Sequence, residues 1–97
     1  MSSTTLIRLA DLYLLDGRSD RAVATIDRAL EVQPDSAPLY ARLGQIEEGQ
    51  YHYYAAEQAY RKAAQLAPDN HQYRDLLAEF GHKLNAAAAA ASKSQAH

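Results

Sequence analysis

The stretch "APLYARLGQIEEGQYHYYAAEQAYRKAAQLAPDN", residues 37–70, decides the fold because it repeats the pattern of the residues before it. A shift of 34 positions, which we call the repeat period, pairs identical residues at six places. These pairs are Arg8 with Arg42, Leu9 with Leu43, Ala22 with Ala56, Ala29 with Ala63, Pro34 with Pro68, and Asp35 with Asp69. Self-similarity at a fixed period is the signature of a repeat architecture. The sequence therefore predicts two equivalent units, residues 3–36 and 37–70.

Each unit has the pattern of two helices joined by a short turn. Leu6, Leu9 and Tyr13 are three or four positions apart, so they fall on one stripe of a helix. Gly17 follows this helix, and its freedom to take the left-handed conformation suits a helix end. Pro34 follows the second helix, where a residue without an N–H stops propagation. We therefore expect an all-α fold built from antiparallel helical hairpins.

The second unit carries a spaced set of large and small residues that identifies its type. The set is Tyr40, Leu43, Gly44, Ala56, Tyr60, Ala63 and Pro68. This spacing resembles the tetratricopeptide repeat, whose unit has the same period, an aromatic-Leu-Gly pattern, an Ala-aromatic pattern and a late proline. The resemblance implies a right-handed α–α superhelix, in which the first helix of each unit lines a concave groove for a partner protein.

Residues 71–91 continue the repeat for one helix only. Leu77 follows Leu43 by one repeat period, so this segment aligns with the first helix of a unit. A single helix at the end of an array covers the open face of the last hairpin, and we expect residues 71–91 to form a C-terminal capping helix. Alanine has the highest helix propensity, so the run Ala86 to Ala91 favours continuation. We expect residues 92–97 to form a disordered tail.

Two positions of the second unit depart from the family pattern. Glu47 stands where the family has tyrosine, and we expect it to weaken packing inside the second hairpin. Gly49 comes earlier in its unit than Gly17 does in the first. This offset predicts a shifted or lengthened turn between the two helices of the second unit.

The resemblance also implies which side chains face a bound partner. The groove positions fall on Ile7, Arg8, Asp11, Arg42, Gln45, Glu48, Gln72, Asp75 and Glu79. Arg8 and Arg42 occupy equivalent places one repeat apart. Two guanidinium groups on the same side of the groove can hold carboxylates or carbonyls of an extended peptide. The alternative is that these arginines pair with Asp11, Gln45 or Asp75 and keep the groove soluble.

The cluster "YHYY", residues 51–54, allows two interpretations. Tyr53 falls where the family has an aromatic residue between hairpins, and we expect it to join Tyr60 in the core. Tyr51, His52 and Tyr54 lie around the bend, where they either shield the turn or form an exposed aromatic tip that binds a partner. Both alternatives remain open at the level of the sequence.

Composition excludes several classes of function. The chain of 97 residues has ten basic and twelve acidic side chains, a net charge of -2 and no cysteine. Without an excess of positive charge, nucleic acid is not an expected partner. The four histidines show no metal-ligand spacing, and there is no phosphate-binding loop or nucleophile motif. We expect no metal, no cofactor and no enzymatic activity, and the apolar runs are too short for direct membrane insertion.

Two functional hypotheses follow. The first is a protein–protein interaction module that binds a peptide or helix of a partner in the groove and acts as an adaptor, scaffold or assembly factor. The second is a structural unit that forms homo-oligomers through its repeat ends, because Leu12, Leu14 and Leu15 have no preceding unit to cover them. The chain could equally belong to a longer repeat array. A cytoplasmic location is the default expectation, with the periplasm as the alternative for a fragment.

Overall fold

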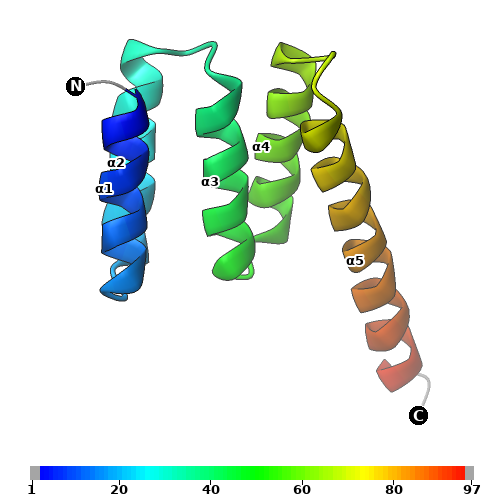
Figure 1. The fold of residues 1–97 in the computed structure, drawn as a ribbon. Coiled ribbons are helices and arrows are strands. Elements are labelled where there is room, and N and C mark those ends of the chain that lie inside the picture. Colours follow the sequence, from blue (N-terminus) through cyan, green and yellow to red (C-terminus); the bar gives the residue numbers. More distant parts are fainter. Residues whose placement is uncertain (1–2, 96–97) are drawn as a thin grey trace.

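The computed structural model describes the backbone of residues 3–95 and the side chains of residues 4–90. This part of the chain forms a row of helices without strands, which confirms the all-α expectation (Figure 1). The helices are α1 (Ser3–Leu15), α2 (Ser19–Val32), α3 (Ala37–Gly49), α4 (Tyr53–Leu66) and α5 (His71–Gln95). Helices α1 and α2 form the first hairpin, α3 and α4 form the second, and α5 packs on the second hairpin.

The repeat period of the sequence holds at every helix boundary of the two hairpins. Helix α3 begins and ends one repeat period after α1, and α4 begins and ends one repeat period after α2. Helix α5 begins one repeat period after α3, so it occupies the place of a third first helix. The sequence repeat is therefore also a repeat of local structure.

The turns inside the two hairpins have the same geometry, so the expectation of a shifted turn at Gly49 is wrong. In the first turn, the N–H of Arg18 donates to the carbonyl of Tyr13 at 2.8 Å. In the second, the N–H of His52 donates to the carbonyl of Glu47 at 2.9 Å. These bonds are typical of a Schellman helix end, which needs one residue with positive φ. That residue is Gly17 in the first hairpin, with φ 74°.

In the second hairpin the residue with positive φ is Tyr51, with φ 65°. Gly49 is the last residue of α3 and has no special conformation. The position of a glycine predicted the wrong turn residue because the hydrogen bonds and the repeat register, rather than residue type, determine where the chain reverses. The turn thus holds an aromatic residue in a conformation that favours glycine.

Polar caps begin the helices that follow the two prolines. The hydroxyl of Ser36 accepts a hydrogen bond from the N–H of Leu39 at 3.4 Å. The side chain of Asn70 accepts one from the N–H of Gln72 at 2.9 Å. Each cap satisfies a free N–H of the first turn of its helix, so α3 and α5 begin where the sequence predicts.

Large side chains fill the core between the helices. Ile26 and Leu39 are fully buried where α3 packs on the first hairpin. Tyr60 and Phe80 are buried where α5 packs on α4, with ring centroids 5.4 Å apart in an edge arrangement. The two interfaces join the hairpins and α5 into one stack.

Gly44 allows the two helices of the second hairpin to approach closely. A Cβ atom at this position would lie 2.6 Å from Cε1 of Tyr60. The ring of Tyr60 therefore packs directly on the backbone of α3. Glu47, the departure from the family pattern, is half-buried, and its carboxylate lies 3.4 Å from Nδ1 of His52.

Helix α5 is longer than expected. It continues to Gln95, so residues 92–95, which we expected at the start of a disordered tail, are helical. The run of alanines is followed by no glycine or proline before this point, so nothing in the sequence stops the helix. Residues 96–97 lie outside the described residues. The end of α5 extends past the other helices (Figure 1).

Candidate interaction cleft

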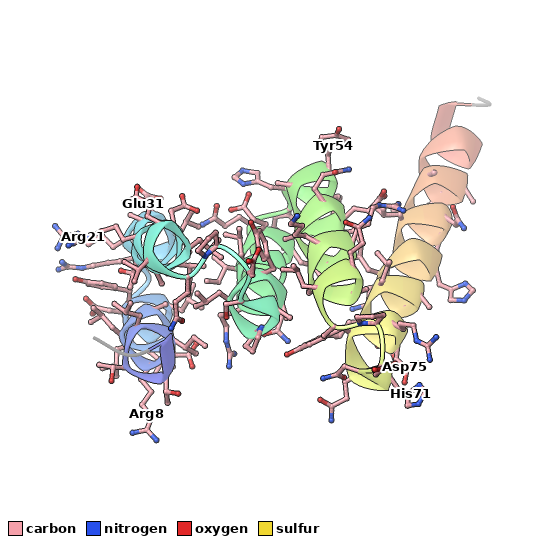
Figure 2. All side chains as sticks on the ribbon, turned by 90° about the horizontal axis from the view of Figure 1, so that it is seen from above. Arg8, Arg21, Glu31, Tyr54, His71 and Asp75 are labelled. Carbon is pink, nitrogen blue, oxygen red and sulfur yellow. The ribbon has the colours of Figure 1, made fainter. Side chains whose placement is uncertain are left out.

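A hollow of about 220 Å³ is lined by residues of α1, α3 and α5. Its lining residues are Ile7, Pro38, Ala41, Arg42, Gln45, Gln72, Tyr73 and Leu76. The structure therefore brings four of the predicted groove residues together, namely Ile7, Arg42, Gln45 and Gln72. We call this site the upper hollow. It lies on the side of the molecule formed by the first helices of the units (Figure 2).

Arg42 is the cation of the upper hollow and is partly engaged by its neighbours. One guanidinium nitrogen lies 3.6 Å from a carboxylate oxygen of Asp11 and donates to the side-chain oxygen of Gln45 at 3.3 Å. Arg42 and Asp11 keep 37% and 42% of their side-chain surface exposed. An exposed ion pair of this length is weak, so the guanidinium can exchange it for another acceptor.

A second hollow of about 180 Å³ lies further along α3 and α5. Its lining residues are Glu48, Tyr51, Tyr53, Lys83, Leu84 and Ala87. We call this site the lower hollow. Residues of α3 and α5 line both hollows, and we call the two hollows together the α3–α5 cleft.

The carboxylate of Glu48 bonds both to a buried residue of the core and to a residue that lines the lower hollow. One oxygen of its carboxylate accepts a hydrogen bond from the hydroxyl of Tyr60 at 2.8 Å. The other accepts one from the ammonium of Lys83 at 3.0 Å. Burial, together with the bond to Glu48, raises the pKa of Tyr60 far above its ordinary value, so the phenol remains neutral. The bond to Glu48 also raises the pKa of Lys83.

The remaining predicted groove residues do not line either hollow. Arg8 is exposed on α1 and its side chain points outward from this helix (Figure 2). Asp75 and Glu79 are exposed on α5. Asp11 reaches the cleft through its ion pair with Arg42.

The three residues of the predicted aromatic tip, Tyr51, His52 and Tyr54, are all exposed. Tyr51 lines the lower hollow and is 76% exposed. Tyr54 is 78% exposed and points to the opposite side from Asp75 (Figure 2). Tyr53, expected in the core, is 37% exposed and contacts Phe80, with ring centroids 5.9 Å apart. Of the predicted tip, the lower hollow therefore includes Tyr51 but neither His52 nor Tyr54.

Sequence reasoning placed Gln72 of α5 in the groove but missed the other α5 residues that line the two hollows, namely Tyr73, Leu76, Lys83, Leu84 and Ala87. Leu76 stands at the repeat position of Arg42, and this change from a charged to an apolar residue was the available signal. Lys83 falls on the water-facing side of the predicted helix, and it is exposed but reaches Glu48 across 35 positions of sequence. No signal in the sequence indicates this contact, because it depends on the angle between α5 and α3.

Membrane insertion and metal binding find no support in residues 3–95. None of the helices there is long and apolar enough to cross a membrane. Among the side chains that the structure describes, no group of three His, Asp or Glu residues is placed to hold a metal ion.

Stacked antiparallel hairpins with an open cleft define the class of helical-repeat proteins. Two models of the family described as tetratricopeptide repeat match the chain, over residues 4–46 and 37–70. The chain belongs to the tetratricopeptide repeat family, and the resemblance in its sequence is confirmed. Repeats of this family generally mediate protein–protein interaction and are generally not catalytic. A comparison with curated proteins gave no match.

Proposed function

We propose that this chain is an adaptor or assembly factor that binds a segment of a partner protein along the α3–α5 cleft. The observation that carries the proposal is that two hollows, of about 220 and 180 Å³, both have lining residues on α3 and α5. Each hollow is large enough for one or two side chains of an extended peptide or of one face of a helix. The activity is recognition, with no bond made or broken.

The two hollows would select different parts of the partner. Ile7, Ala41 and Leu76 supply an apolar lining in the upper hollow, which favours an aliphatic or aromatic anchor. Arg42 lies beside that lining and can donate to a carbonyl or carboxylate of the partner. The rings of Tyr51 and Tyr53 border the lower hollow, where they can cover an apolar or a basic side chain.

Binding should be weak for an isolated cleft of this size. A partner segment loses conformational freedom when it is ordered, and this offsets much of the contact energy. We expect a dissociation constant on the order of micromolar. Neighbouring repeats or a second contact would be needed for tighter binding.

A matched pair of arginine variants tests the proposal. Arg42→Ala removes the cation of the upper hollow, whereas Arg8→Ala removes an exposed cation from α1 that lines neither hollow. The variants and the wild type are used to capture partners from extracts of the cells that make the protein, followed by quantitative mass spectrometry. We expect Arg42→Ala to reduce a specific partner at least five-fold and Arg8→Ala to leave it unchanged.

The control is the helix content of each variant, because both arginines are on the surface and neither change should unfold the chain. Partners that are captured equally by all three proteins would contradict the proposal. If only Arg8→Ala lost the partner, the binding surface would lie around Arg8 on α1 rather than in the α3–α5 cleft.

A further inference from the structure

The first hairpin has an apolar outer face at the N-terminal end of the stack. A hollow of about 380 Å³ lies on it, and its lining residues are Leu6, Leu9, Tyr13, Thr25, Arg28, Glu31 and Val32. On the same hairpin, Leu12 is 61% exposed and Val32 is 76% exposed. We call these residues, with Leu12, the N-terminal end face. Of the three exposed large aliphatic side chains among the described residues, Leu12, Leu15 and Val32, two belong to this face.

A comparison of equivalent positions in the two units indicates that this face is built to pack against another helix. Leu12 occupies the position of Ile46, which lies one repeat period later. Ile46 is only 3% exposed, because it packs in the cluster that joins α3 to the first hairpin. Leu12 is therefore placed to pack against a neighbouring helix, as its counterpart does.

The opposite end of the stack does not match this face. On α5, which forms that end of the stack, the charged residues Arg74, Asp75 and Glu79 are exposed (Figure 1). An apolar face that docked there in a head-to-tail array would bury these charges without partners, which is unfavourable. Head-to-tail stacking of copies is therefore disfavoured.

The N-terminal end face is instead complementary to itself. Arg28 and Glu31 both border the hollow, and both are exposed. In a pair with two-fold symmetry the same patch meets itself, so residue i of one copy contacts residue j of the other and the reverse. Two antiparallel α2 helices would then place each Arg28 opposite the other copy's Glu31. Figure 2 shows Arg21 projecting from α2 at the N-terminal end of the stack and Glu31 on the side of α2 that is turned away from α1.

We propose that a second copy of this chain covers the N-terminal end face, in a two-fold dimer with reciprocal Arg28–Glu31 ion pairs around an apolar centre. The face is two helices wide, and helices of 13 and 14 residues are about 20 Å long. Such a face is at the small end of specific interfaces, which bury about 800 Å² per partner. The dimer is therefore weak, with a dissociation constant on the order of 10 to 100 µM.

Charge reversal tests the reciprocal pairing. Arg28→Glu gives each copy two acidic groups on the face, and Glu31→Arg gives each copy two basic groups, so each variant alone repels itself. Mixing the two variants restores opposite charges at both contacts. Sedimentation velocity at low salt, from about 5 µM to 1 mM protein, should show that each single variant dimerises at least ten-fold more weakly than the wild type. The equimolar mixture should recover dimer.

The control is Lys62→Glu, which reverses a charge at the repeat position of Arg28 but on α4. It should leave dimerisation unchanged. A wild-type monomer throughout the range, assemblies that grow beyond two copies, or a mixture that stays monomeric would each overturn the proposal. This dimer uses the outer edge of the first hairpin and stands apart from the proposed α3–α5 cleft, so either proposal can fail alone.

Discussion

At the scale of single residues, Tyr51 is the point where sequence and backbone conflict. Its φ of 65° lies in the left-handed region, where Gly17 stands in the first hairpin. A residue with a Cβ atom in this region is disfavoured by about 1 kcal/mol. We expect Tyr51→Gly to be more stable than Tyr51→Ala by about 1 kcal/mol, although both lose the same ring. Urea unfolding of the two variants measures this difference.

The first hairpin supplies the control for Tyr51. Gly17→Ala places a side chain at φ 74° with no heavy atom within 4 Å, so conformation is the only expected effect. It should destabilise the protein by about 1 kcal/mol. Equal stability of Tyr51→Gly and Tyr51→Ala would contradict the strained turn.

Gly44 gives a second prediction at this scale. A Cβ atom here would lie 2.6 Å from Tyr60, a distance that real contacts do not reach, so Gly44→Ala forces the ring or α3 to move. We expect a loss of about 1–3 kcal/mol. Gly81→Ala is the matched change, since Gly81 lies within α5 with nothing within 4 Å. There alanine should stabilise the helix by up to about 1 kcal/mol, and thermal unfolding should order the two variants accordingly.

The raised pKa of Asp27 predicts how the stability of the protein depends on pH. Partial burial, followed by the charges of Glu47 and Glu31, raises its pKa above the ordinary value of 3.8. The folded chain therefore holds this proton more tightly than the unfolded chain, and ionised Asp27 opposes folding at neutral pH. Asp27→Asn should raise the melting temperature slightly at pH 7, and the gain should vanish below pH 3.8. A gain that grows towards acid pH would contradict this assignment.

At the scale of elements, α5 has two parts with different support. Phe80 is 2% exposed and packs against the second hairpin, whereas the side chains of residues 85–90 are exposed. Helices without tertiary packing are marginal in water even when they are rich in alanine. We expect amide hydrogens around Phe80 to exchange at least ten-fold more slowly than those of residues 86–90. Equal protection along α5 would show that another contact supports its far end.

The sequence predicted the elements well because their signals are local. The repeat period, the caps at Ser36 and Asn70 and the prolines after α2 and α4 are all readable without tertiary structure. The residue with positive φ in the second turn and the end of α5 were not predicted from the sequence. The turn is set by backbone hydrogen bonds that accept Tyr51 in place of glycine, and the alanine run carries no stop signal.

At the scale of the whole molecule, the cleft was only partly predictable. Equivalent positions in the repeat located Arg42, Gln45 and Gln72, because the first helices share one side of the stack. The same reasoning grouped Arg8 with them, but Arg8 lines neither hollow. The lower hollow depends on how α5 crosses α3, and crossing angles are set by packing rather than by sequence spacing.

Site-specific photo-crosslinking tests the central claim, that the α3–α5 cleft holds the partner. A benzophenone amino acid replaces Gln45 or Gln72, which line the upper hollow, or Gln58 or Gln65, which are exposed on α4. Because all four are glutamines on the surface, folding should be equally tolerant of each change. The account predicts crosslinks to one partner from positions 45 and 72 and none from positions 58 and 65. The reverse pattern, or equal crosslinking from all four positions, would contradict it.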